Sequence, residues 1–289
     1  MSSTIQQQDS PHVKIHRSIA KLTHIDMFYM DTKTEGPAVL CLHGRWGRAE
    51  TWVDFIHQYG KQFRVIAPDQ RGHGLSSKPV SNYTAEEMAE DIKELIIHLN
   101  LESVIIVGHS MGGGVAGYMA ALHPEYIQAL AILDKSANGP DERNPVSLEQ
   151  IPAVDPVTKD WPLPFSSLCE AKHYIRGAMV SELSYQYFIN SLIETPEGYE
   201  MMFSPQAIAA NIAYYVNWYS LLPSIKCPVL LIRAKNSEGL PDADYMKMQS
   251  LLPNCHAYEI SHPDHNVHLG NKEEFYTCMD LFLDGLRLI

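Results

Sequence analysis

The sequence predicts an α/β protein with a mostly parallel central sheet, helices on both faces of that sheet, and one inserted segment. Short apolar runs alternate with longer segments of helical periodicity, which is the pattern of consecutive βαβ units. Most of the apolar runs are continuous, as expected of parallel strands that are covered on both faces. The alternation stops in a proline-rich stretch after Ala137 and resumes at Cys227, which indicates an insertion.

Each expected strand is a short run of aliphatic and β-branched residues bounded by turn-forming residues. Three helices are expected from apolar residues at helical spacing, over residues 84–99, 110–122 and 272–286. The first of them begins at Thr84, and Glu87 lies where a capping box needs an acidic side chain. The expected strands cover residues 25–30, 38–42, 64–67, 103–107, 129–133, 229–233 and 256–260.

The predicted elements divide the chain into a core and a cap. Residues 14–137 and 227–289 carry the strand and helix pattern, so they are expected to form the core. Residues 138–226 are expected to form an inserted helical cap. This segment is rich in Met, Tyr and Trp, and it has helical runs over residues 165–192 and 204–222.

The composition favours a protein that acts on small molecules. The chain has 34 acidic and 22 basic side chains and a formal net charge of −12. This charge disfavours nucleic acids and anionic membranes as partners, because their phosphates would be repelled. A small substrate that is neutral or weakly polar is expected instead. Nothing in the sequence indicates an oligomeric state.

The sequence gives no sign of export. Residues 1–13 are polar and lack an apolar run, so they are expected to be a disordered leader and not a secretory signal. No stretch approaches the roughly 18 consecutive apolar residues that span a membrane. The five cysteines are scattered without a Cys-X-X-Cys pair, which favours free thiols in a reducing compartment. The expected location is therefore the cytoplasm.

A candidate nucleophile lies in Gly108-His109-Ser110-Met111-Gly112, between an expected strand and an expected helix. A serine on a tight strand-to-helix turn needs neighbours without a Cβ atom, so that the chains can approach closely. The N-terminus of the helix would add positive partial charge where an oxyanion develops. Such a serine is a weak nucleophile unless an imidazole removes its proton and a carboxylate orients that imidazole.

The chain resembles the α/β-hydrolase family with a helical cap, from about residue 14 to 286. The resemblance is carried by four segments in the family's order: His43-Gly44, the loop 69–76, the elbow at Ser110, and residues 227–232 followed by 264–268. Four ordered segments are far more specific than one short motif. The resemblance implies a triad in the chain order serine, acid, histidine, which works through an acyl-enzyme and needs no cofactor.

The resemblance also implies the catalytic base. The family places this histidine between the last strand and the C-terminal helix, and His265 occupies that position. His262 and His268 lie three residues to either side, a spacing that could suggest a metal site. No further cluster of metal ligands lies nearby in the sequence, so no metal is expected. His109 is expected to pack in the elbow with its side chain turned away from the nucleophile.

Two carboxylates remain open as the acid of the triad. The loop after the strand 229–233 normally carries an Asp, but this chain reads Ala-Lys-Asn-Ser there, and Glu238 follows one position later. Asp134 is the alternative, since some relatives, including haloalkane dehalogenases, take their acid from the end of the preceding strand. Asp134 could also serve only to hydrogen-bond the loop that enters the cap.

Further site residues follow from the same resemblance. The oxyanion hole is assigned to the backbone N–H groups of Met111 and Arg45, with Trp46 as a nearby alternative. The side chains of Trp46, Trp218 and Tyr214 are candidate substrate contacts, although an aromatic stripe on a helix is more often part of a core.

The leading functional hypothesis is hydrolysis of a small ester, thioester or lactone. A serine at the nucleophile position disfavours dehalogenase and epoxide-hydrolase chemistry, which in this family uses Asp there. A carbon–carbon bond hydrolase, a cofactor-free haloperoxidase and an acyltransferase of the same fold are alternatives. A small-molecule receptor with slow or no turnover is an alternative from another functional class.

Overall fold

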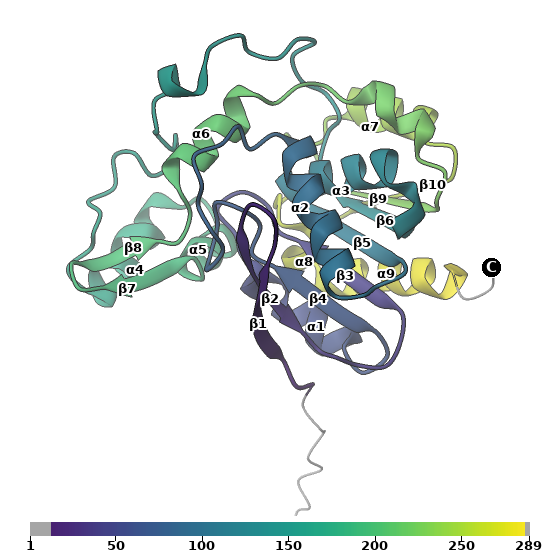
Figure 1. Cartoon of the computed structure of the whole chain (residues 1–289), viewed down its shortest axis with the longest axis horizontal. Helices are drawn as coiled ribbons and strands as arrows, with labels where there is room; N and C mark the ends of the chain where they lie inside the picture. The colour runs from purple at the N-terminus through teal and green to yellow at the C-terminus, as the bar shows by residue number, and fades with distance from the viewer. Residues whose placement is uncertain (1–12, 287–289) are drawn as a thin grey trace, which may run out of the picture.

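The computed structural model describes residues 13–286. The leader expected over residues 1–13 therefore lies, apart from Val13, outside the described residues. An eight-stranded sheet crosses the middle of the molecule in the order β1-β2-β4-β3-β5-β6-β9-β10 (Figure 1). β2 is antiparallel to both of its neighbours, and every pair from β4 to β10 is parallel. This architecture confirms the predicted fold class.

The strands lie close to their expected positions, with one addition. They are β1 (His16–Lys21), β2 (Asp26–Asp31), β3 (Ala38–Leu42), β4 (Arg64–Pro68), β5 (Val104–His109), β6 (Ile127–Leu133), β9 (Val229–Ala234) and β10 (Cys255–Ile260). β1 was not expected, because only one of its side chains is fully buried and its sequence has no apolar run. It forms the edge of the sheet, where a strand is covered less completely than one at the centre.

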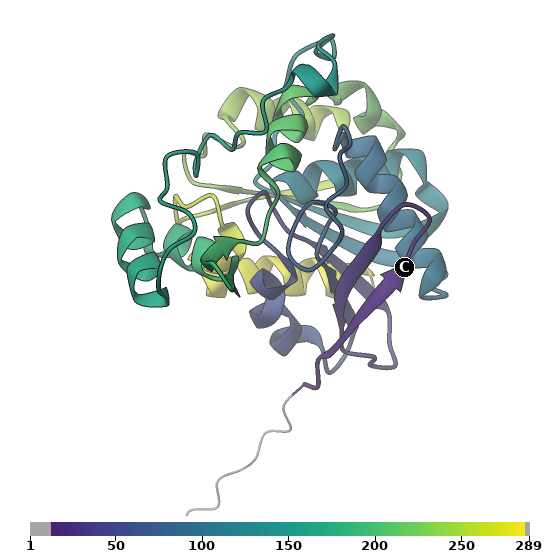
Figure 2. The ribbon, with the colours of Figure 1, turned by 60° about the vertical axis from the view of Figure 1, so that its left-hand side comes forward.

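Helices cover both faces of the sheet (Figures 1 and 2). Alternate side chains of β3 show how the two faces separate, since Leu40 packs with α2 and α3 while Val39 packs with α1 and α9. The helices of the core are α1 (Val53–Tyr59), α2 (Ala85–His98), α3 (Met111–Leu122), α7 (Asp242–Leu251), α8 (Val267–Gly270) and α9 (Lys272–Leu286). The predicted N-cap residue of α2 is confirmed, because Thr84 Oγ1 accepts a hydrogen bond from Glu87 N.

The segment between β6 and β9 lies beside the sheet, on the left in Figure 1. It contains α4 (Leu168–Ala178), α5 (Glu182–Ile189), β7 (Leu192–Thr195), β8 (Gly198–Met201) and α6 (Pro205–Ala213). The expectation of a helical segment agrees with α4, α5 and α6 but not with residues 192–201, where β7 and β8 pair as an antiparallel hairpin. Side chains from these elements form an apolar cluster around Phe165 and Phe188, separate from the two clusters that pack on the sheet.

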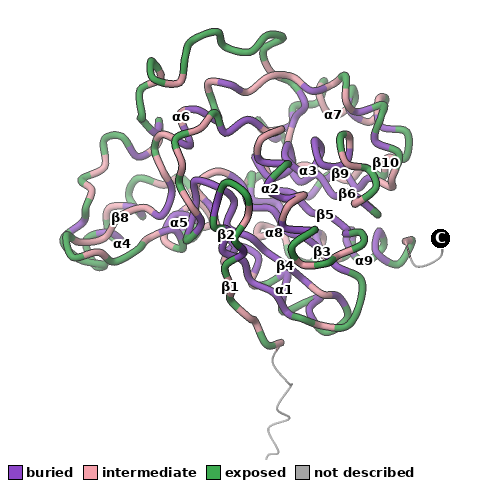
Figure 3. Tube along the Cα trace, viewed as in Figure 1, coloured by how far each residue is buried: buried purple, intermediate pink, exposed green. Residues whose placement is uncertain are grey.

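Burial differs sharply between these two parts of the chain (Figure 3). The central strands are buried along nearly their whole length, whereas the stretch from Asn138 to Gln150 is mostly exposed. Within residues 13–286, no helix has the length and apolar character that a membrane crossing requires. The loops that follow the carboxyl ends of the parallel strands lie between the sheet and the inserted segment, which is where α/β proteins generally bind ligands.

Candidate active site

Ser110 lies on a strained turn between β5 and α3. Its φ is 52° and its ψ is −117°, a conformation that is costly for a residue with a side chain. The flanking glycines are required by close contact, because a Cβ on Gly108 would lie 2.2 Å from Gly112 O and one on Gly112 would lie 2.4 Å from Leu42 O. The steric reading of this motif is therefore correct, and the turn exposes Ser110 beyond the end of the strand.

Strand order brings residues far apart in sequence to the same edge of the sheet. β5, β6, β9 and β10 are parallel neighbours, and their last paired residues align, His109 with Leu133 and Ala234 with Ile260. Ser110 and Asp134 directly follow two of these strands. The loop after β10 carries His265 to the same edge, so the topology alone explains why these three residues meet.

His265 and Asp134 form a direct hydrogen bond. His265 Nδ1 lies 2.6 Å from Asp134 Oδ2. A carboxylate accepts, so Nδ1 carries the proton and Nε2 of the neutral ring keeps its lone pair. The Asp134 side chain is 0% exposed, whereas that of His265 is 44% exposed. The pair therefore presents a solvent-facing imidazole that is oriented from behind by a buried carboxylate.

Asp134 accepts two further hydrogen bonds. Ala234 N donates to Asp134 Oδ1 at 2.9 Å, and Ser237 Oγ donates to Oδ2 at 2.6 Å. Three hydrogen bonds thus hold this carboxylate in one orientation. Ser237 stands where relatives of this kind normally carry an Asp, and here its hydroxyl supports the carboxylate on the neighbouring strand. Glu238 is exposed on the cleft wall, and within residues 13–286 no hydrogen bond joins it to His265.

Ser110, Asp134 and His265 line one cleft of about 770 Å³. Among the described residues, no hydrogen bond links Ser110 Oγ to His265. Such a bond is often long in the absence of substrate and shortens in the substrate complex. The cleft has room for a small molecule of several non-hydrogen atoms.

His109 contacts the loop that carries the base. Its Nε2 lies 2.9 Å from the backbone oxygen of His265, and a carbonyl only accepts, so Nε2 is the donor. The rings of His109 and His265 are 4.8 Å apart. Burial lowers the pKa of His109 well below its usual value, which keeps the ring neutral. His109 is buried in the elbow, as expected, and it also contacts the loop that carries the proposed base.

The loop after β3 carries the amide groups assigned to the oxyanion hole. His43 holds this loop, since its Nδ1 donates to Gly44 O at 2.8 Å and its Nε2 accepts from Gln70 N at 2.9 Å. Met111 begins α3, so its N–H has no carbonyl partner within that helix. Arg45 lies in the same loop as Gly44 and lines the cleft with Ser110.

A tyrosine from the inserted segment completes this loop. Tyr187 on α5 is buried, and its hydroxyl accepts a hydrogen bond from Gly44 N at 3.0 Å. A Cβ on Gly47 would lie 2.1 Å from this hydroxyl oxygen, so glycine is required there. The sequence analysis missed this residue, because nothing in a sequence indicates which of the 15 tyrosines reaches across to β3.

The three aromatic residues proposed as substrate contacts lie in different places. Trp46 lines the cleft, and its Nε1 donates to Asp155 Oδ1 at 2.9 Å. Tyr214 lines an adjoining cavity, and its hydroxyl donates to a backbone oxygen. Trp218 lines neither space. Trp218 is 1% exposed, and its ring packs so closely on α3 that a Cβ on Gly117 would lie 2.5 Å from it. It therefore belongs to the core beneath α3.

The three regularly spaced histidines do not converge. His268 is buried and stacks on Trp52 with their ring centroids 4.6 Å apart, and burial lowers its pKa to about 3. His262 Nδ1 accepts a hydrogen bond from Asp264 N at 3.1 Å. His265 faces the cleft instead. His262 and His265 lie in the loop before α8, and His268 lies in α8 itself. Their regular spacing therefore does not indicate a shared ligand.

Gly239 packs directly against the His265–Asp134 pair. A Cβ at this position would lie 2.8 Å from His265 Nδ1 and 3.1 Å from Asp134 Oδ2. We expect Gly239→Ala to lower kcat by about tenfold, because sub-ångström displacement of catalytic groups costs this much or more. Steady-state kinetics on a short ester measures the change. Gly177→Ala is the control, since a Cβ there meets nothing within 4 Å. Equal rates for both variants would contradict a role for this contact.

Comparison with known proteins agrees with the architecture. Residues 37–159 match the family model described as alpha/beta hydrolase fold. An uncharacterized protein of Mycobacterium tuberculosis is 40% identical over 104 residues, which is 36% of this chain. The chain spans only 30% of the length of that relative.

Two similarities extend over nearly the whole chain. The 2-(acetamidomethylene)succinate hydrolase of Mesorhizobium japonicum is 25% identical over 261 residues, 88% of this chain and 90% of that protein. The crystal structure of an E-2-(acetamidomethylene)succinate hydrolase superposes with a TM-score of 0.80 at 22% identity, covering 94% of this chain and 100% of the other. The sheet order, the strained serine turn and these matches together show that the chain has the α/β-hydrolase fold.

Proposed function

We propose that this protein is a serine hydrolase that cleaves a small ester, thioester or lactone, with Ser110 as nucleophile, His265 as base and Asp134 as the acid. The observation that carries the proposal is the 2.6 Å hydrogen bond from His265 Nδ1 to the buried Asp134, beside the strained Ser110 turn. This arrangement supports Asp134 over Glu238 as the acid, since Glu238 is exposed.

The proposed reaction begins with acylation. Ser110 Oγ attacks the carbonyl carbon while His265 Nε2 takes the hydroxyl proton, and Asp134 stabilises the resulting imidazolium. The oxyanion accepts hydrogen bonds from the N–H groups of Arg45 and Met111. The tetrahedral intermediate then collapses, the bond to the leaving oxygen or sulfur breaks, and His265 returns its proton to that atom. The acyl group remains on Ser110.

Deacylation repeats these steps with water as the nucleophile. His265 takes a proton from water, the hydroxide oxygen attacks the acyl carbon, and Ser110 Oγ leaves with the proton that His265 returns. The products are the free acid and the alcohol or thiol. Residues 138–226 act in this proposal as the cap over the cleft, and the direct contacts from Tyr187 and Asn211 to the loop after β3 support that role.

The first test of this function needs only the wild-type protein. Short p-nitrophenyl esters are expected to be hydrolysed, and a fluorophosphonate is expected to abolish that activity while adding one adduct to the peptide that contains Ser110. Absorbance kinetics and peptide mass spectrometry measure the two effects. A receptor without turnover would leave the esters intact, and an adduct on a different residue would remove Ser110 from the mechanism.

A further inference from the structure

Two cations adjoin the proposed nucleophile, and neither forms a salt bridge among the described residues. Lys135 directly follows Asp134 at the end of β6, and Arg45 lies in the loop after β3. Within residues 13–286, neither side chain takes part in a salt bridge, although the chain carries a net charge of −12. Most lysines without a salt bridge are exposed to solvent, whereas Lys135 and Arg45 are partly buried, so water solvates their charges less completely.

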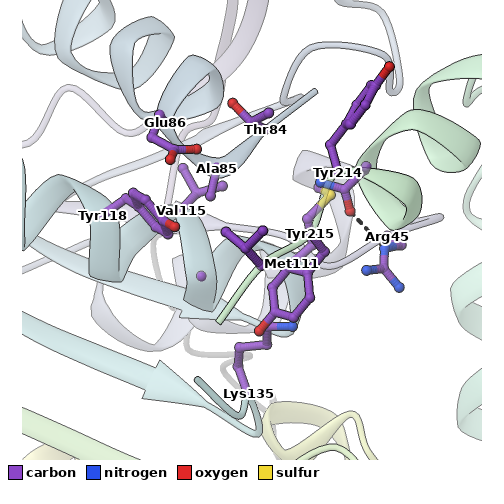
Figure 4. Close-up of a pocket in the computed structure, with 13 residues that line it drawn as sticks. Arg45, Thr84, Ala85, Glu86, Met111, Val115, Tyr118, Lys135, Tyr214 and Tyr215 are labelled. Atoms are coloured by element: carbon purple, nitrogen blue, oxygen red, sulfur yellow. Dashed lines mark hydrogen bonds between the residues drawn. The ribbon is translucent and has the colours of Figure 1, made fainter. Parts of the chain in front are cut away.

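Both residues line two separate spaces. Arg45 and Lys135 belong to the walls of the large cleft and also to those of a small inner cavity of about 20 Å³. Met111 and Asn211 line the inner cavity as well. Figure 4 shows Lys135 against the Tyr215 ring and Arg45 to the right of that ring. A cavity of this size holds one water molecule or a group of similar size.

Neutral groups hold the two cations in place. Lys135 Nζ lies 4.0 Å from the centroid of the Tyr215 ring, and Arg45 Nε donates to Asn211 Oδ1 at 2.8 Å. The Asn211 amide is itself oriented, because its Nδ2 donates to Tyr83 O at 2.8 Å. A ring face and an amide position a cation without neutralising it. Burial lowers the pKa of Arg45 and the charge of Asp155 raises it, but Asp155 forms no salt bridge with Arg45, so both cations can still attract an anion.

The surroundings raise the energy of the charged lysine. The glycines at the start of α3 make room for its chain, since a Cβ on Gly113 would lie 3.1 Å from Lys135 Cβ. A cation near the N-terminus of a helix is repelled by the helix dipole, whereas an anion there is attracted. Burial, and then repulsion from Arg45, lower the pKa of Lys135 to about 7. An anion bound between the two side chains would relieve all of these effects.

Most carboxylates near this cleft are engaged by other groups, and none forms a salt bridge with Lys135 or Arg45 among the described residues. Asp134 is bound to His265, and Asp264 accepts from Ser181 Oγ at 2.6 Å. Glu86, which lines the inner cavity, lies 3.2 Å from Arg143. Two further carboxylates remain, of which Asp155 accepts from Trp46 Nε1 at 2.9 Å and Glu238 is exposed.

We propose that Lys135 and Arg45 form an anion subsite that binds a second carboxylate on the acyl part of the substrate. The acyl group stays on Ser110 in the large cleft while the leaving group departs, and only its terminal carboxylate is small enough to reach the cavity wall formed by Lys135 and Arg45. The substrate class is then a half-ester or half-thioester of a short dicarboxylic acid, which replaces the neutral or weakly polar substrate expected from composition. The reaction step rests on the proposed function, whereas the anion subsite does not.

The test compares two esters that differ by one charge. Monomethyl glutarate carries a carboxylate, and methyl 4-carbamoylbutanoate carries a neutral amide of the same shape. At pH 6, where Lys135 is protonated, we expect the wild-type kcat/KM to favour the anionic ester by about tenfold or more, as a charge-assisted hydrogen bond provides. Lys135→Met is expected to abolish this preference. The corresponding succinate and adipate pairs cover shorter and longer spacers.

Two further variants keep the outcome decisive. Lys247→Met is the matched control, since it also removes a lysine that lies over a tyrosine ring, at 3.6 Å from the Tyr219 centroid, but on the exposed surface of α7. It is expected to keep the preference. Arg45→Met is expected to weaken the preference for the anionic ester. It replaces Lys135→Met as the test variant if that protein does not fold. A wild type without preference at any spacer length, or a Lys135→Met protein that keeps it, overturns the subsite.

A binding measurement separates this proposal from the proposed function. Isothermal titration with glutarate and with neutral glutaramide needs no turnover. Glutarate is expected to bind the wild type more tightly than it binds Lys135→Met, and glutaramide is expected to distinguish the two proteins much less. If the esters are not hydrolysed but glutarate binding depends on Lys135, the hydrolase function fails and the subsite stands. If the neutral esters are hydrolysed but glutarate does not bind, the subsite fails and the hydrolase function stands.

Discussion

Replacing Ser110 with alanine is expected to lower kcat for hydrolysis of a short ester by about 10⁴- to 10⁶-fold, because no acyl-enzyme can form without the hydroxyl. Residual turnover would come from the oxyanion amides and from substrate binding alone. The variant should fold, because alanine removes only the side-chain hydroxyl. The flanking glycines and the backbone hydrogen bond from Ser110 N to Leu133 O stay in place.

The measurement is steady-state hydrolysis of p-nitrophenyl acetate, with the thermal midpoint as the folding control. An unchanged midpoint together with a collapse in kcat is the predicted combination. A Ser110→Ala protein that keeps the wild-type kcat would show that another group performs the chemistry, whatever the geometry of the turn.

Replacing Asp134 with asparagine is expected to lower kcat by about 10³- to 10⁴-fold. The amide carries no negative charge, so it cannot stabilise the imidazolium of His265. It can also present its NH₂ group to Nδ1, which favours the tautomer with the proton on Nε2, and that tautomer cannot accept the proton of Ser110. Asp134 is 0% exposed, so water cannot substitute for the lost carboxylate.

Glu238→Gln is the matched control for this change, because it also converts a carboxylate of the cleft wall into an amide. We expect its kcat to stay within about threefold of the wild-type value, as for most exposed substitutions. The reverse order of effects would make Glu238 the acid and would leave Asp134 with a structural role in the loop after β6.

Much of the fold could be predicted from the sequence, because strands covered on both faces must be continuously apolar. β3 and β5 show this clearly, since all of their residues are buried. The hairpin of β7 and β8 could not be predicted in the same way. Its residues are only partly buried, so they carry no period that distinguishes a strand from a helix.

The site was predictable to the extent that motifs and chain order determine it. Ser110 and His265 follow from such local context, and Asp134 remained one of two alternatives. The choice between Asp134 and Glu238 depends on which loop reaches His265 Nδ1, and the hydrogen bond between that atom and Asp134 supports Asp134. Lys135 could not be singled out from the sequence, because its proposed role depends on its place in the cleft and on the absence of a salt bridge to it within residues 13–286, and neither is visible in a sequence.

The rate at which a fluorophosphonate labels Ser110 tests the central claim most directly, because it reports the reactivity of the nucleophile without requiring the natural substrate. The account predicts that Asp134→Asn slows labelling by about 10²-fold or more, while Glu238→Gln labels at close to the wild-type rate. Labelling of Asp134→Asn at the wild-type rate would contradict the triad of Ser110, His265 and Asp134.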